Sequence, residues 1–150
     1  MSRAYPERPI VGVGAVVWCH DKVLLIRRAK PPRVGSWSIP GGAQKVGETV
    51  FEAARREIME ETTIDIRVLG LVDVVDSIRH DENGRVQYHY TLVDVVGEWR
   101  DGEPTPLDDA AEAAWFDLDQ LDTLDMWSET IRVIHLAHDK RTEFTGIDRD

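Results

Sequence analysis

Apolar residues recur along much of the chain with the spacing and the β-branched character of strands. Runs of this kind, bounded by turn residues, predict strands. They are Ile10–Cys19, Lys22–Arg28, Trp37–Ile39, Ile64–Ile78, Val86–Val96 and Glu112–Leu118. Asn83-Gly84 is a strong hairpin signal between two of these runs. The prolines and glycines of Ala29–Ser36 and Gly97–Ala110 are typical of loops.

Two segments have helical spacing instead. The first runs from about Glu48 to Thr62, where Phe51, Ala54 and Ile58 form one apolar stripe that can pack on a sheet. The second is Ser128–Lys140. The pattern predicts a mixed sheet with at least two helices, an α+β or α/β/α sandwich fold. We expect one domain over residues 1–150, with loose ends at 1–9 and 142–150.

Composition narrows the class of protein. The chain has 28 Asp+Glu against 18 Lys+Arg and a formal net charge of -10, which argues against sequence-independent binding of nucleic acid. No apolar run is long enough for a signal peptide or a membrane span. Cys19 is the single cysteine, which excludes an internal disulfide framework. We therefore expect a cytoplasmic protein with neither a nucleic-acid partner nor a membrane anchor.

Glutamates crowd the end of the first helix. Glu57, Glu60 and Glu61 stand at i, i+3 and i+4, so their carboxylates converge although like charges at this spacing destabilise a helix. Carboxylates in such a group are good ligands for hard divalent cations such as Mg²⁺ or Mn²⁺. Gly41 and Gly42 would let a backbone carbonyl approach the same ions. Spacing alone leaves two interpretations open, a metal site and a solvated acidic face.

The complete motif resembles the box of the Nudix hydrolases. Gly42, Glu48, Arg56-Glu57-Ile58, Glu60-Glu61 and Ile64 stand at the positions of that box. Chance agreement is below roughly one in ten million per starting position. The likeness extends from about Val11 to the final helix. It implies the Nudix fold, a mixed-sheet α/β/α sandwich in which the box forms a loop, a helix and a loop.

The resemblance also implies a function. Nudix enzymes hydrolyse a nucleoside diphosphate linked to another moiety, and their box glutamates hold the cations that polarise phosphate and activate water. By this likeness Glu57, Glu60 and Glu61 are metal ligands, together with the carbonyl of Gly41. Glu57 and Glu60 are also catalytic candidates. Glu48 and Arg56 would form an ion pair that orients the metal-binding carboxylates, and the alternative is an ordinary surface pair. Related proteins are often homodimers.

The motif does not specify which residue is the general base or which residue contacts a phosphate. Nudix enzymes take the base from a box glutamate or from an acidic residue on a distant loop. Asp108, Asp109 and Glu112 are the loop candidates, and we select Asp109, in a loop that could fold over the site. A solvated acidic turn is the alternative. Arg28, at the end of its strand, could contact a phosphate or form a salt bridge.

Within the family, the chain looks most like the short ADP-ribose pyrophosphatase branch, which implies cleavage of ADP-ribose to AMP and ribose 5-phosphate. Another group of ADP-ribose hydrolases carries a proline some fifteen residues past the box, where this chain has Arg79-His80. Two alternatives therefore stay open. One is a pyrophosphatase of normal or oxidised nucleoside triphosphates, and the other is a non-catalytic nucleotide sensor.

Thr63 is the one departure from the box, because the family has glycine there. Glycine past a helix end adopts the left-handed conformation without penalty. A β-branched residue is strained in that conformation. Thr63 therefore either carries that strain or ends the helix by a different, extended turn, and we expect the extended turn.

Overall fold

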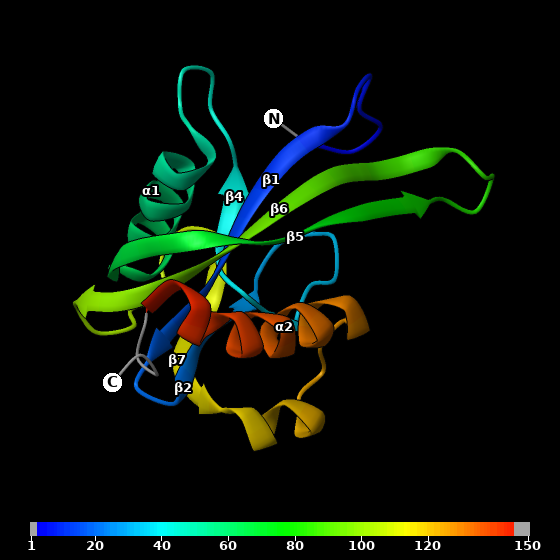
Figure 1. The fold of residues 1–150 in the computed structure, drawn as a ribbon. Coiled ribbons are helices and arrows are strands. Elements are labelled where there is room, and N and C mark those ends of the chain that lie inside the picture. Colours follow the sequence, from blue (N-terminus) through cyan, green and yellow to red (C-terminus); the bar gives the residue numbers. More distant parts are fainter. Residues whose placement is uncertain (1–2, 146–150) are drawn as a thin grey trace.

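The computed structural model describes residues 3–145 and shows a twisted sheet between helices (Figure 1). The strands are β1 (Ile10–Cys19), β2 (Lys22–Arg28), β3 (Trp37–Ser38), β4 (Gly41–Ala43), β5 (Asp65–His80), β6 (Val86–Asp101) and β7 (Ala110–Asp117). The helices are α1 (Val50–Thr62), the short 3₁₀ helix Leu118–Thr123 and α2 (Ser128–Thr145). This is the predicted α+β sandwich.

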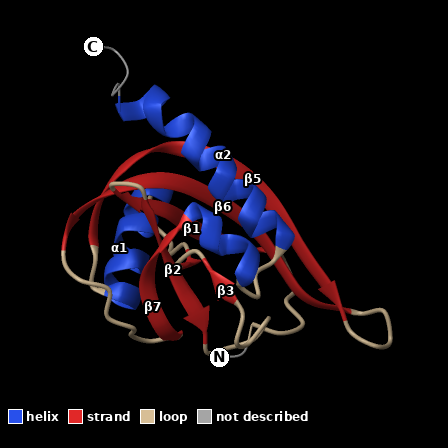
Figure 2. Cartoon of the chain, turned by 90° about the horizontal axis from the view of Figure 1, so that it is seen from below, coloured by secondary structure: helices blue, strands red, loops and turns tan. Residues whose placement is uncertain are grey.

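The sheet is mixed, as the sequence predicts. Within residues 3–145 it has seven strands, with the path β3-β2-β1-β6-β5, while β4 pairs with β1 and β7 pairs with β2. β1 runs parallel to β6 and antiparallel to β2 and β4. Figure 2 shows α1 and α2 on opposite sides of this sheet. The long β5–β6 hairpin extends beyond the helices in both views.

Two cores lie on the two faces of the sheet. Val13, Ala15 and Val17 of β1 pack with Ala54 and Ile58 of α1. Alternate residues of the same strand belong to the other core, in which Val16 and Trp18 pack with Val133, Ile134 and Ala137 of α2. Because both faces of β1 are covered, its apolar residues form a nearly continuous run instead of alternating with polar ones.

The first helix differs in detail from the prediction. It begins at Val50 because Thr49 caps it: the Glu52 N–H donates to Thr49 Oγ1 at 3.1 Å, and the Thr49 N–H donates to Glu52 Oε1 at 2.8 Å. This reciprocal pair is a capping box. The predicted apolar stripe is partly wrong, because Phe51 is exposed and Ala53 is buried in its place.

Other element boundaries also shift. The sequence did not predict β4, whose glycines are unusual in a strand but let the chain lie close to β1. β6 continues to Asp101 and so takes the first residues of the expected loop. Helix α2 continues to Thr145, so residues 142–145 are helical and not a loose tail, and 146–150 lie outside the described residues.

The start of the chain is less loose than expected. Residues 3–9 form no helix or strand, but the Tyr5 N–H donates to the Gln87 carbonyl at 2.7 Å and the Tyr5 hydroxyl donates to Asp81 at 2.8 Å. These bonds hold the segment on the β5–β6 hairpin. None of the helices in the described part of the chain has the length and apolar character needed to cross a membrane.

Candidate functional site

A cleft of about 440 Å³ brings most of the predicted site residues together, while Glu48 and Arg56 lie outside its lining. One part of its lining, which we call the acidic end, consists of Glu57, Glu60, Glu61, Asp108 and Asp109. Another part, the sheet floor, consists of Gly12, Gly14, Tyr90, Leu92 and Asp94. The acidic residues come from α1 and from the loop before β7, and the floor comes from β1 and β6.

Glu61 is the most deeply placed of the box glutamates, with a relative exposure of 6%. Its Oε1 accepts a hydrogen bond from the Gly41 N–H at 3.1 Å. The pKa of Glu61 is raised to about 7, chiefly by burial and also by the negative charges of Glu57 and Asp109. A bound cation would balance the negative charge of the Glu61 carboxylate in these surroundings.

Glu57 lies directly against Gly42. A Cβ atom at Gly42 would overlap the Glu57 carboxylate, so a side chain at this position would displace the glutamate. Gly41 is similarly enclosed, because its Cβ would overlap the Val13 carbonyl of β1. The two glycines are therefore needed for close packing of β4 between β1 and the box glutamates.

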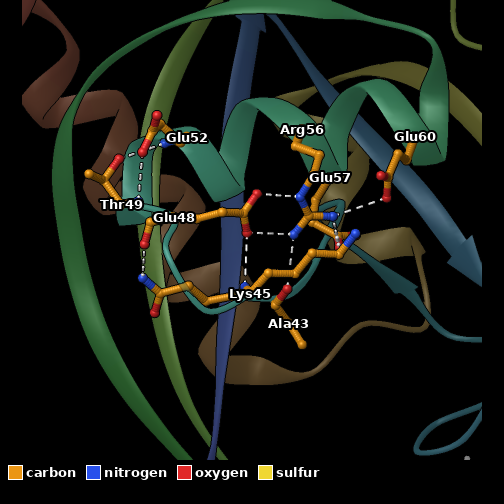
Figure 3. Close-up of polar contacts among 9 residues, drawn as sticks. Ala43, Lys45, Glu48, Thr49, Glu52, Arg56, Glu57 and Glu60 are labelled. Carbon is orange, nitrogen blue, oxygen red and sulfur yellow. Dashed lines mark hydrogen bonds and ion pairs between the residues drawn. The ribbon is translucent and has the colours of Figure 1, made fainter.

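Arg56 organises the glutamates through several ion pairs (Figure 3). Its guanidinium donates to Glu48, to Glu57 Oε1 at 2.7 Å and to Glu60 Oε2 at 3.0 Å. It also donates to the Ala43 carbonyl at 3.1 Å. The side chains of Arg56 and Glu48 are only 20% and 18% exposed, so this is not an ordinary surface pair. The Arg56 hydrogen bond is the main cause that lowers the pKa of Glu48 to about 2.

These residues fit a divalent cation in chemistry, although they are not yet gathered around one point. Among residues 3–145, no group of three or more Asp, Glu, His or Cys side chains is close enough to hold a metal ion. The reason is visible in the ion pairs, since Arg56 holds Glu57 and Glu60 while Glu61 binds Gly41. The hard oxygen ligands, the raised pKa of Glu61 and the close approach of the Glu57 carboxylate to Gly42 nevertheless match what Mg²⁺ or Mn²⁺ requires.

The three candidates for the loop base are separated by the structure. Asp108 and Asp109 line the cleft, whereas Glu112 lies outside the cleft lining and pairs with Arg27 at 3.2 Å. Asp109 Oδ1 lies 2.9 Å from Lys30 Nζ. The loop is also less free than expected, because the N–H groups of Thr105 and Leu107 donate to the carbonyls of Thr62 and Glu61. Asp109 is therefore already held beside the box helix.

The cleft also has a cationic side. Arg28 lines it, as expected for a phosphate contact, and its guanidinium donates to the carbonyls of Pro32 at 2.7 Å and Pro31 at 3.4 Å. These carbonyls fix the side chain without neutralising it. Lys30 and Arg33, which sequence analysis missed, line the cleft as well. A dense group of cations beside two prolines is the signal that could have identified them.

Among the aromatic residues considered for stacking, Trp37 lines the cleft and Trp115 packs against the core beside α1. Two further cleft residues were not predicted. Trp127 lies just before α2, with the Arg33 guanidinium 4.7 Å from its ring centroid. Asp94 interrupts the apolar run of β6, and a charged residue at a buried strand position is a recognisable signal.

Comparison with known proteins agrees with this geometry. The model of the NUDIX domain family matches residues 8–137, which is most of the chain. The chain belongs to the Nudix family. An ADP-ribose pyrophosphatase of Methanocaldococcus jannaschii is 40% identical over 116 residues, which are 77% of this chain and 66% of that protein. An oxidized purine nucleoside triphosphate hydrolase of Danio rerio is 29% identical over 73% of this chain and 67% of that protein. The chain thus spans about two thirds of the length of these curated relatives.

Solved structures show the same family. The MutT NUDIX hydrolase from Burkholderia pseudomallei has a TM-score of 0.74 and 32% identity, covering 87% of this chain and 98% of that one. Its fold matches the mixed sheet and helices described above. The predicted Nudix fold is therefore confirmed.

The expectation for Thr63, the departure from the Nudix box, is wrong. Thr63 ends α1 in the left-handed conformation, with φ 63° and ψ 6°. Its N–H donates to the Met59 carbonyl at 3.0 Å, and its hydroxyl donates to the Glu103 carbonyl at 2.9 Å. The second hydrogen bond offsets part of the strain and ties the helix end to the loop that carries Asp109. This hydrogen-bond partner lies forty residues away in the chain, so it could not be predicted from the local sequence.

We expect Thr63→Gly to be neutral or mildly stabilising, within about 1 kcal/mol. Glycine removes the left-handed strain, but the variant also loses the hydrogen bond to Glu103 and gains unfolded-state entropy. Thr63→Ala is the matched control, because it keeps the strain and loses the hydrogen bond. It should be destabilised by about 1 kcal/mol in urea unfolding. If Thr63→Gly is the less stable of the two, left-handed strain is not significant at this position.

We expect the metal-free protein to be most stable in mildly acidic solution. Burial raises the pKa of both Glu61 and Asp94 to about 7, so the folded protein holds protons that the unfolded chain releases at lower pH. Stability should fall as pH rises from about 4.5 toward 7, by on the order of 1–3 kcal/mol, and should level off above pH 7. Below about pH 4 it should fall again, because carboxylates whose pKa is lowered by arginines, such as Asp65 and Asp73, become protonated.

Thermal unfolding in EDTA at several pH values measures this dependence. Glu61→Gln and Asp94→Asn should each flatten the curve near neutral pH. Adding Mg²⁺ should raise the midpoint most above pH 7, where the carboxylates are ionised. A metal-free protein that becomes more stable from pH 6 to pH 8 would contradict both raised pKa values.

Proposed function

We propose that the protein is a divalent-cation-dependent Nudix hydrolase that cleaves a nucleoside diphosphate linked to another moiety. The observation that carries the proposal is the meeting of box glutamates, a loop aspartate and cations in one cleft. A diphosphate needs positive charge around its oxygens, and its hydrolysis needs a group that accepts a proton from water. The intact glutamate set speaks against a non-catalytic sensor.

Each residue has a definite task in this proposal. Glu57, Glu60, Glu61 and the Gly41 carbonyl would hold Mg²⁺ or Mn²⁺, which supplies charge neutralisation and activation of water when bound. Arg56 and Glu48 orient Glu57 and Glu60 through the ion pairs described above. Asp109 accepts the proton from the attacking water. Arg28 and Lys30, which line the same cleft, bind phosphate oxygens.

The bond changes follow from these positions. The water oxygen forms a bond to one phosphorus atom, and the bond between that phosphorus and the bridging oxygen breaks. The proton passes to the Asp109 carboxylate and then to solvent, and the second phosphate leaves with the bridging oxygen. For ADP-ribose the products are AMP and ribose 5-phosphate.

We propose ADP-ribose as the preferred substrate. The support is the relative from Methanocaldococcus jannaschii, a protein described as an ADP-ribose pyrophosphatase, at 40% identity. A nucleoside triphosphate is the second candidate, supported by the Danio rerio relative at 29% identity. The higher identity favours ADP-ribose. The same cleft would serve either substrate, because both present a diphosphate to the glutamates.

A substrate screen with Mg²⁺ tests the proposal. The ratio of kcat/KM values for ADP-ribose, ordinary nucleoside triphosphates and 8-oxo-dGTP decides the preference. We expect the highest value for ADP-ribose, no turnover in EDTA, and AMP as a product. A higher value for 8-oxo-dGTP would reverse the assignment. Nucleotide binding without hydrolysis of any diphosphate would favour the sensor.

A further inference from the structure

Asp94 is a buried carboxyl group that the proposed reaction does not use. It lies in β6 between Val93 and Val95, has a relative exposure of 6%, and forms part of the sheet floor of the cleft. Within residues 3–145 its carboxyl group has no hydrogen-bond donor. Burying a carboxyl group without a hydrogen bond is costly, so a purely structural role does not account for its presence.

The fold provides space for this side chain. Asp94 stands beside Gly14 in the parallel pairing of β1 and β6. A Cβ atom at Gly14 would lie 2.8 Å from Asp94 Oδ1 and 2.9 Å from Ile39 Cδ1. Any larger residue in place of Gly14 would therefore push the carboxyl group or Ile39 aside. The absence of a side chain at Gly14 of β1 lets Asp94 occupy the floor of the cleft.

The charged groups around Asp94 do not neutralise it. Its pKa is raised to about 7, chiefly by burial and also by the charge of Asp73, with Arg132 acting in the opposite direction. The guanidinium of Arg132 is already shared, because it donates to Asp73 at 2.9 Å and to Glu129 at 3.1 Å. The carboxyl group therefore keeps its hydrogen-bonding capacity for a molecule in the cleft.

The surroundings of Asp94 suit a nucleobase better than a phosphate. Ile39 and Asp94 both lie against Gly14, and Tyr90 and Leu92 precede Asp94 at alternate positions of β6 and line the cleft with it. The cation Arg28 lies instead at the end of β2, and Lys30 lies in the loop that follows, where it pairs with Asp109. A phosphate beside Asp94 would place two acidic groups together, whereas a base could rest on the apolar residues and donate a hydrogen bond.

We propose that Asp94 selects the base of the nucleotide by accepting a hydrogen bond from an exocyclic amino group. This inference rests on the proposed function and deepens it. A carboxyl group accepts such a bond whether or not it is protonated. When the carboxyl group is ionised, as at the pH of about 8 used in the test below, a base with a carbonyl oxygen in the same place would face it acceptor to acceptor. Asp94 therefore favours adenine over hypoxanthine.

The test compares ADP-ribose with its hypoxanthine counterpart, inosine diphosphate ribose, at a pH of about 8, where the Asp94 carboxyl group is ionised. We expect the wild-type protein to prefer the adenine compound by about 10- to 100-fold in kcat/KM, the range of one buried hydrogen bond to a carboxylate. Asp94→Leu should abolish this preference, mainly through KM for the adenine compound. Its melting temperature should rise, because leucine removes a buried carboxyl group. A merely structural residue would instead lower the melting temperature when replaced.

Asp94→Asn is the second variant. The asparagine side chain can accept from an amino group or donate to a carbonyl oxygen. It should retain adenine binding and gain hypoxanthine binding, so that the two substrates become nearly equal. A discrimination ratio unchanged in both variants would overturn the proposal. A loss of thermal stability in both variants would also overturn the proposal.

Binding of AMP, measured by calorimetry without Mg²⁺, separates this inference from the proposed function. If no diphosphate is hydrolysed by the wild-type protein, the proposed function fails. AMP binding that weakens about 10-fold or more in Asp94→Leu would then still support base selection by Asp94. AMP affinity equal in the wild type and both variants would refute it.

Discussion

Replacing Glu57 or Glu61 with glutamine should lower kcat by roughly three powers of ten in the presence of Mg²⁺. Glutamine has nearly the same shape but no negative charge, so the variant loses a cation ligand while the backbone stays unchanged. Glu61→Gln should be at least as stable as the wild type when metal is absent, because burial disfavours the Glu61 carboxylate. Loss of activity together with retained stability separates a metal ligand from a structural residue.

Two matched variants complete this experiment. Glu60 is 43% exposed at its side chain, so Glu60→Gln should lose less activity than either of the buried positions. Glu82→Gln, in the exposed turn between β5 and β6, should behave as the wild type. Turnover that survives in both Glu57→Gln and Glu61→Gln, or full activity in excess EDTA, would show that these carboxylates do not hold the metal.

The box residues could be predicted because their relation is local. Glu57, Glu60 and Glu61 lie within two turns of one helix, and helical spacing alone places them together. The ion pair between Arg56 and Glu48 was also expected. The contacts of Arg56 with Glu57, Glu60 and the Ala43 carbonyl were not, since they depend on how the Gly41–Ala43 strand lies against α1.

The remaining features depend on contacts between distant segments. A threonine at position 63 predicts an extended helix end. Its hydroxyl donates to the Glu103 carbonyl, and this hydrogen bond offsets part of the strain of the left-handed conformation. From the sequence alone, Asp94 is one polar residue in an apolar strand. Only the pairing of β6 with β1 places it beside Gly14. Local spacing carries no information about either partner.

The arrangement of the cleft explains why an acidic protein can bind an anion. The net charge is -10, yet Arg28, Lys30 and Arg33 line the same cleft as the glutamates. A cation bound by the glutamates would make the acidic end attractive to a diphosphate as well. The proposed metal requirement and the proposed substrate class therefore agree with the same charge distribution.

Asp109→Asn should lower kcat by about 10²- to 10⁴-fold while KM changes little, because asparagine cannot accept the proton of the attacking water. The position of Asp109 supports this effect: the residue lines the cleft, and its loop is tied to the end of α1 through Glu61 and Thr62. Its charge also contributes to the raised pKa of Glu61.

The neighbouring acids are the controls for this prediction. Glu112→Gln should retain activity, because Glu112 pairs with Arg27 outside the cleft lining. Asp108→Asn changes an acid of the same cleft, in a residue with φ 49°, a conformation that asparagine tolerates. We expect it to lose less than Asp109→Asn. Lys30→Met should mainly raise KM, since Lys30 pairs with Asp109 but cannot replace it as an acceptor of protons. A large loss of kcat in Asp108→Asn with normal turnover in Asp109→Asn would assign the base to Asp108. Wild-type turnover in all four variants, the three acid variants and Lys30→Met, would place the base among the box glutamates.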